Sequence, residues 1–116
     1  MIHLAALLHI VNPPPALQDQ YERINVGGTA TVVAAAIQAG VRRVVFFRTI
    51  AVYGQSDGRI VTEDTPPCPD TFYARTKHDA EGIVLEAKRS DGGRLGTVLR
   101  LGAVYGARIK GNYQQL

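Results

Sequence analysis

The chain has 116 residues, of which 46% are hydrophobic and 20% charged, with a formal net charge of +3. Such a chain forms one small domain, and its composition is typical of a globular α/β protein rather than a disordered one. Its basic residues are scattered and form no stripe with aromatic side chains, which argues against nucleic-acid binding. The one cysteine, Cys68, cannot form an internal disulfide, and no apolar run reaches membrane-spanning length. We therefore expect a cytoplasmic protein without a membrane partner.

The first half of the chain predicts a strand, a helix and a second strand. An apolar strand is expected at residues 1–5, followed by an Asn-Pro-Pro-Pro run at 12–15 that forbids regular structure. A helix is expected over residues 17–39, with Gly40 placed to end it. The next strand, over 41–47, is apolar on both faces, which is typical of a central parallel strand covered by helices.

The second half predicts a long loop, a helix and a third strand. Residues 50–71 are rich in Gly, Asp and Pro and are expected to form the loop. A helix is expected over 71–88 and a strand over 96–101, while the polar tail from 106 has no clear period. The helix should turn a core stripe inward, made of Ala80, Ile83, Val84 and Ala87. Alternating strands and helices indicate a parallel sheet with right-handed crossovers, which is an α/β fold.

Tyr73 and Lys77 lie four residues apart, so helical spacing places them on one face of the second helix. The same face continues with Ala80, Val84 and Ala87, which are apolar. A lysine on such a face is costly unless it has a role or a partner. A cation near a phenol favours the phenolate and lowers the pKa of the tyrosine, which would make Tyr73 a general acid/base. The alternative is a half-buried tyrosine beside a lysine that reaches solvent.

Parallel sheets of this kind bind ligands at the carboxyl ends of their strands. A crossover helix starts where the preceding strand stops, so the helix of Tyr73 and Lys77 begins at the same edge. Thr49, at the end of the second strand, is expected to meet them there. The segments at this edge are residues 4–6, 48–50 and 101–103.

Several motifs follow one another in the order and spacing of a known family. They are Ile2-His3-Leu4-Ala5-Ala6, Asn25-Val26-Gly27-Gly28-Thr29, the strand at 41–47 with Thr49 and Val52-Tyr53-Gly54, Glu63-Asp64-Thr65-Pro66 with Pro69, Tyr73-x-x-x-Lys77 with Glu81, and Leu99-Arg100 with Val104-Tyr105-Gly106. On this ordered set, over residues 2–106, the chain resembles the extended short-chain dehydrogenase/reductases, the NAD-dependent epimerase/dehydratase family. The resemblance implies a partial Rossmann-like sheet of three strands and two crossover helices. Residues 1–106 would be part of the NAD(P)-binding domain, and 107–116 would start a truncated substrate-binding region.

The resemblance also implies roles for single residues. Tyr73 would be the acid/base for a substrate hydroxyl, Lys77 would lower its pKa and bind the nicotinamide ribose, and Thr49 would hold the substrate hydroxyl. The implied cofactor is NAD, with NADP not excluded, and no metal is implied. The residues expected to approach the cofactor are Leu4, Ala5, Ala6, Asn25, Tyr73, Lys77 and Gly102.

Small residues in two of these motifs have a second explanation. Ala5 and Ala6 are explained equally by tight packing. A glycine within a helix costs roughly 1 kcal/mol relative to alanine. Gly27 and Gly28 therefore indicate either close approach to a strand or cofactor, or a helix that begins later, with both glycines in its entry turn.

The implied reaction is oxidation of a hydroxyl of a nucleotide sugar or related alcohol, followed by epimerisation or dehydration and return of the hydride. A homodimer formed through the helices is a further implication for the full-length family. Two other readings are open: a truncated, non-catalytic relic, and a dinucleotide-binding module without chemistry.

Three departures from the family pattern set limits on this reading. The Gly-x-x-Gly-x-x-Gly run that binds the cofactor pyrophosphate is not in the sequence. By resemblance the chain would start at the fourth strand and stop before most of the substrate domain, so we expect it to bind NAD weakly or not at all. Three strands with exposed edges should also be poorly stable alone. Finally, Arg48 stands where the family has a small serine, and would crowd the site or reach a phosphate, with crowding favoured.

Overall fold

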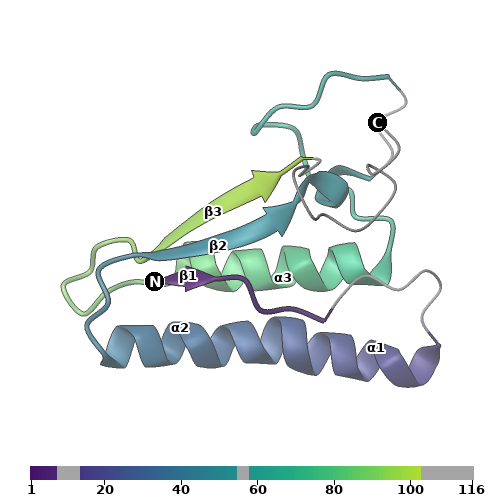
Figure 1. Ribbon diagram of the computed structural model, residues 1–116. Helices are drawn as coiled ribbons and strands as arrows, with labels where there is room; N and C mark the ends of the chain where they lie inside the picture. The colour runs from purple at the N-terminus through teal and green to yellow at the C-terminus, as the bar shows by residue number, and fades with distance from the viewer. Residues whose placement is uncertain (8–13, 55–57, 103–116) are drawn as a thin grey trace, which may run out of the picture.

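The computed structural model describes residues 1–7, 14–54 and 58–102. Within them, three parallel strands form one sheet in the order β1-β2-β3 (Figure 1). The strands are β1 (Ile2–His3), β2 (Val44–Thr49) and β3 (Gly96–Leu101). The central strand β2 pairs with both neighbours, and all six of its residues face β3 in register, from Val44 opposite Gly96 to Thr49 opposite Leu101. The α/β class with a three-stranded parallel sheet is thus confirmed.

The first crossover is a continuous helical run on one face of the sheet (Figure 1). It consists of α1 (Pro15–Tyr21), a π-helical segment η1 (Glu22–Gly27) and α2 (Gly28–Gln38). Pro15 suits the start of α1, because the first helical residue needs no intrahelical amide bond. The run passes through Gly27 and Gly28, so the expectation of a helix that begins after them is wrong. Among the described residues, no atom lies within 4 Å of a Cβ added at either glycine.

The second crossover contains a short 3-10 helix η2 (Ile50–Tyr53) and the long helix α3 (Phe72–Glu86). Thr71 caps α3, because its side-chain oxygen accepts a hydrogen bond from the Ala74 amide at 3.1 Å. The predicted core stripe is confirmed: Ala80 and Val84 are fully buried, and Ile83 and Ala87 pack against the same cluster. Figure 1 shows α3 on the same face of the sheet as α1 and α2.

The main core lies between this face of the sheet and the helices. Its buried members are Val33, Ala36, Val44, Phe46, Ala80, Val84 and Leu95. Strand β3 approaches α3 so closely at its start that a Cβ added at Gly96 would collide with the backbone of Val84. The amino end of the sheet is therefore a tightly packed apolar layer.

Strands β1 and β2 differ from their predicted ranges at both ends: β1 starts one residue later, and β2 extends to Thr49 rather than to residue 47. Strand β2 begins at Val44 rather than at residue 41, because the Val41 amide bonds the Ala36 carbonyl and belongs to the closing turn of α2. Strand β1 ends at His3 rather than at residue 5. Beyond it, the Leu7 amide bonds the Asn25 side chain at 2.8 Å instead of a neighbouring strand. The third strand has its predicted limits.

Within the described ranges, we find no helix with the length and apolarity needed to cross a membrane. The Val104-Tyr105-Gly106 motif, the polar tail and the proposed domain boundary at residue 106 lie outside those ranges.

Candidate active site

Tyr73, Lys77 and Glu81 follow each other at one-turn intervals on the face of α3 that meets the sheet. Lys77 is only 4% exposed and Glu81 3%, while Tyr73 is half-buried. The lysine therefore does not reach solvent, and the alternative of a solvent-directed lysine is wrong. A buried ammonium needs compensation from its surroundings.

The ammonium of Lys77 lies over an aromatic ring. Its Nζ is 4.7 Å from the ring centroid of Phe46, which is a cation–π contact. Burial lowers the pKa of Lys77 to about 8, and the charge of Arg48 acts in the same direction. At neutral pH the amine thus holds its proton much less firmly than an exposed lysine does.

The phenol of Tyr73 has the opposite shift to the one expected from the sequence. Its ring meets Tyr21 edge to face, with 6.2 Å between the centroids. Burial raises the pKa of Tyr73, Tyr21 adds to the rise, and only the charge of Arg48 works against it. The expected lowering by Lys77 is wrong for this structure, because desolvation outweighs nearby charge and Lys77 is held over Phe46.

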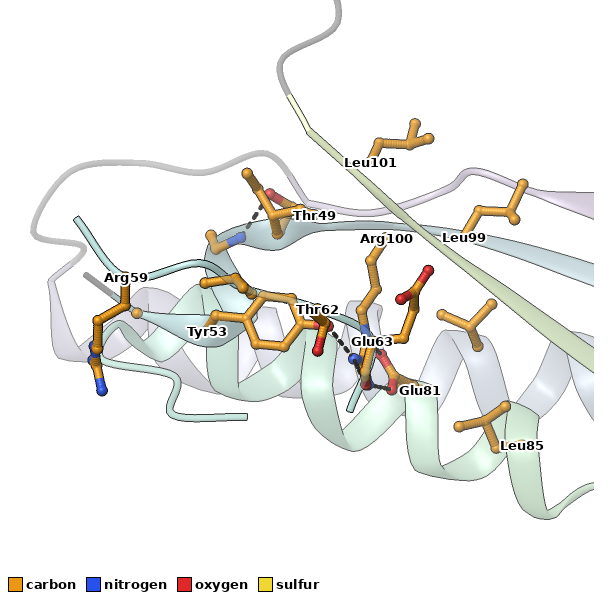
Figure 2. Close-up of a pocket in the computed structure, with 15 residues that line it drawn as sticks. Thr49, Tyr53, Arg59, Thr62, Glu63, Glu81, Leu85, Leu99, Arg100 and Leu101 are labelled. Carbon is orange, nitrogen blue, oxygen red and sulfur yellow. Dashed lines mark hydrogen bonds and ion pairs between the residues drawn. The ribbon is translucent and has the colours of Figure 1, made fainter. Parts of the chain in front are cut away.

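Thr49 ends β2, and its hydroxyl oxygen accepts a hydrogen bond from the Ala51 amide at 3.2 Å, which caps η2. It lines a pocket between β3, η2 and α3, shown in Figure 2. Tyr73 and Lys77 are not among the residues that line this pocket. The structure therefore places Thr49 at the edge where α3 begins, in the wall of a pocket that Tyr73 and Lys77 do not line.

One part of the pocket wall holds a charged cluster built on Glu81. Arg100 donates from Nη2 to Glu81 Oε1 at 2.5 Å and from Nε to Oε2 at 3.2 Å. Its Nη1 donates to the hydroxyl of Tyr53, as Figure 2 shows. Burial alone would raise the pKa of Glu81, but the hydrogen bonds from Arg100 and Arg48 hold it below its usual range. Glu81 is therefore a carboxylate.

Arg48 has a partner that the sequence did not predict. Its side chain is fully buried, and Nη1 donates to Glu81 Oε2 in an ion pair. Its Nε and Nη2 have no hydrogen-bond partner within the part of the chain that the structure describes. Burial lowers the pKa of Arg48, although Glu81 opposes that effect. One signal was in the sequence: Glu81 comes four residues after Lys77, on the same helical face.

Asn25, predicted near the cofactor, lies in η1 and forms hydrogen bonds both to the segment after β1 and to α3. It is 1% exposed, its Oδ1 accepts from the Leu7 amide, and its Nδ2 donates to Thr76 Oγ1 at 3.2 Å. Thr76 in turn donates to the carbonyl of Tyr73 at 3.0 Å. The residue thus joins the segment after β1 to the helix of Tyr73 and Lys77.

The other residues expected at the cofactor lie at the carboxyl ends of β1 and β3 and are exposed or half-buried. Leu4 is 66% exposed, Ala5 and Gly102 are exposed, and Ala6 is half-buried. Tight packing within the described chain therefore does not explain Ala5. His3 in β1 is buried, and its Nε2 lies 3.0 Å from Thr29 Oγ1.

Comparison with known proteins identifies the family. The model of the NAD dependent epimerase/dehydratase family matches residues 1–115. UDP-glucose 4-epimerase of Vibrio cholerae is 31% identical over 122 residues, spanning 100% of this chain and 36% of its own.

Two solved structures are similar in fold. MoeE5 in complex with UDP-glucose and NAD is 38% identical with a TM-score of 0.75, over 85% of this chain and 33% of that chain. RMD from Pseudomonas aeruginosa complexed with NADPH is 26% identical with a TM-score of 0.72, over 87% of this chain and 35% of that chain.

The chain spans about a third, or less, of the length of the curated relatives it matches. Its match to the family model nevertheless covers almost all of its residues. The chain therefore belongs to the NAD-dependent epimerase/dehydratase family.

Proposed function

We propose that the chain carries the proton-handling half of an NAD-dependent enzyme that oxidises and re-reduces a hydroxyl of a nucleotide sugar. The observation that carries the proposal is the burial of Lys77, 4% exposed, one helical turn from Tyr73 at the carboxyl edge of a parallel sheet. A buried lysine needs a function or a partner. In the described chain, its nearest compensation is the ring of Phe46 rather than a carboxylate.

The residues present fit one half of a dinucleotide. Leu4, Ala5 and Gly102 are exposed residues at the carboxyl ends of β1 and β3, the edge at which such sheets bind a nicotinamide and its ribose. The sequence contains no Gly-x-x-Gly-x-x-Gly run for the pyrophosphate. NAD is the cofactor that we propose; the solved relatives include complexes with NAD and with NADPH.

The bound nicotinamide would supply hydride transfer, and the chain would manage the proton. During oxidation of the substrate hydroxyl, the O–H proton would pass to the Tyr73 phenolate. In the return step, the Tyr73 hydroxyl gives that proton back. Lys77 would hold the ribose and Thr49 the substrate hydroxyl. The open pocket lined by Thr49 and Arg100 would accept the sugar end of the substrate.

The decisive test is Tyr73→Phe, measured in a protein in which residues 1–116 follow a glycine-rich phosphate loop. Turnover of UDP-glucose should fall by a factor of about 100 or more, while NAD affinity measured by calorimetry stays within about twofold. Arg75→Gln, on the exposed face of the same helix, is the matched control and should keep full activity. Unchanged turnover in Tyr73→Phe would remove this residue from the mechanism.

A second candidate is a dinucleotide-binding module without catalysis, and the raised pKa of the Tyr73 phenol favours it. Bound NAD with no turnover in the unsubstituted protein would support this candidate. The 116-residue chain alone should bind NAD weakly or not at all, and micromolar binding in calorimetry would contradict that expectation. Pairing of two copies through their helices remains a prediction that light scattering would test.

A further inference from the structure

We propose that Arg48 is a positioning residue of the Tyr73–Lys77 site: its buried guanidinium, anchored on Glu81, supplies the positive charge that favours the phenolate of Tyr73. This inference rests on the proposed function for its catalytic meaning. The effect of the Arg48 charge on the protonation of Tyr73 does not require an active enzyme, and it is tested separately from turnover.

The anchoring is visible in the geometry. Arg48 lies opposite Arg100 in the register of β2 and β3, and both side chains reach the same carboxylate on α3. Arg48 is the fully buried member of this pair of cations, whereas the Arg100 side chain is 21% exposed. Two of the three nitrogens of Arg48 have no hydrogen-bond partner among the described residues. Glu81 therefore fixes the guanidinium without using all of its donors.

The charges around α3 do not balance. Among the residues that the structure describes, Lys77, Arg48 and Arg100 bring three positive charges to the sheet-facing side of the helix, against the one carboxylate of Glu81. An uncompensated buried cation favours a negative charge nearby. A phenolate on Tyr73 would supply that negative charge.

The groups that act on Tyr73 come from the elements packed against α3. Helix α2 has no ionisable residue and η1 buries only Asn25. The ionisable groups that face α3 are Tyr21 from α1, His3 from β1, Arg48 from β2, Tyr53 from η2 and Arg100 from β3, with Lys77 and Glu81 on α3 itself. Of these, Tyr21 raises the pKa of the Tyr73 phenol and Arg48 lowers it.

Arg48 also acts on the lysine. Its charge lowers the pKa of Lys77, in addition to the effect of burial. One fixed cation thus moves the pKa of the phenol and of the ammonium in the same direction. A loosened structure has a different signature: better hydration lowers the pKa of a tyrosine but raises that of a lysine.

The experiment is a pH titration of Tyr73 and Lys77 by carbon-13 NMR, without cofactor, with Tyr73→Phe used to assign the tyrosine signal. In Arg48→Met, the pKa of both groups should rise, and in Arg48→Lys both should stay near their original values. Arg100→Met is the matched control, since it also removes one cation from Glu81. It should leave the pKa of Tyr73 unchanged.

Several outcomes would overturn the proposal. An unchanged or lowered pKa of Tyr73 in Arg48→Met would do so, and so would an equal rise in Arg100→Met. If Arg48→Met does not fold, Arg48→Gln can replace it, because glutamine keeps a hydrogen-bond donor for Glu81 and removes the charge. The pKa of Tyr73 should then rise in Arg48→Gln, and an unchanged or lowered pKa would overturn the proposal. In an active protein, Arg48→Met should lose on the order of tenfold in kcat at pH 7 and recover at higher pH. Absence of turnover would refute the proposed function while leaving the titration result intact.

Discussion

The two ends of the interface between α3 and the sheet are built from different chemistry. At the amino end of the strands, Val44, Val84 and Leu95 are apolar and fully buried. At the carboxyl end, the corresponding positions hold Arg48 and Glu81, which are equally inaccessible but charged. Apolar burial stabilises a fold directly, whereas buried charges cost free energy unless they are paired. The comparison indicates that apolar packing holds one end of the interface and that ion pairing around Glu81 holds the other.

The largest effect is expected from removing the shared carboxylate. Glu81→Gln leaves Arg48 and Arg100 close together without a counter-charge, and should lower the free energy of unfolding by about 3–5 kcal/mol. Denaturant unfolding measures the loss. Glu86→Gln, at an exposed position of the same helix, should leave stability unchanged. An equally small effect at both positions would mean that the charged end contributes nothing to stability.

The apolar end should respond to cavities. Leu95→Ala removes a fully buried side chain from the core and should cost about 2–5 kcal/mol in unfolding free energy. Leu99→Ala, at a position 41% exposed on the next strand, should cost much less. Equal losses would show that the core described here is not the main source of stability.

Alanine substitutions at the glycines near the two ends of β3 should distinguish an effect on packing from an effect on cofactor binding. Gly96→Ala places a methyl group against the Val84 backbone and should cost about 1–3 kcal/mol of unfolding free energy. Gly102→Ala meets no atom within 4 Å in the described chain, so stability should be kept. In a protein that binds NAD, Gly102→Ala should instead weaken that binding. Equal losses of unfolding free energy in Gly96→Ala and Gly102→Ala would contradict this distinction.

The smallest effect is a pH dependence caused by Lys77. Its pKa is lowered to about 8, so between pH 8 and pH 10 the unfolded chain binds more protons than the folded one. The free energy of unfolding should therefore contain a component that rises with pH across this window. Above pH 10 the raised pKa of Tyr73 acts in the opposite direction, because there the folded state retains the phenolic proton. Lys77→Met should remove the rise in denaturant unfolding at pH 7.5, 8.5 and 9.5, and a persistent rise would point to another group.

Hydrophobic period and motif order were sufficient to predict the parallel sheet, the helix face of Tyr73 and Lys77, and the core stripe of α3. These features depend on local spacing, which a sequence displays directly. The pairing of Arg48 with Glu81 depends on the distance between a strand end and the third turn of a helix, which local spacing does not give. The raised pKa of Tyr73 was missed for a related reason, since the sequence shows a neighbouring lysine but not the degree of desolvation.

The π-helical segment η1 has a mechanical consequence. It carries Asn25, whose two amide ends bond the chain after β1 and Thr76, and Thr76 bonds the carbonyl of Tyr73. Hydrogen bonds therefore link three backbone segments that are distant in sequence: the segment after β1, η1 and the first turn of α3. A shift of the segment after β1 would therefore be transmitted through Asn25 and Thr76 to the first turn of α3, which carries the phenol of Tyr73.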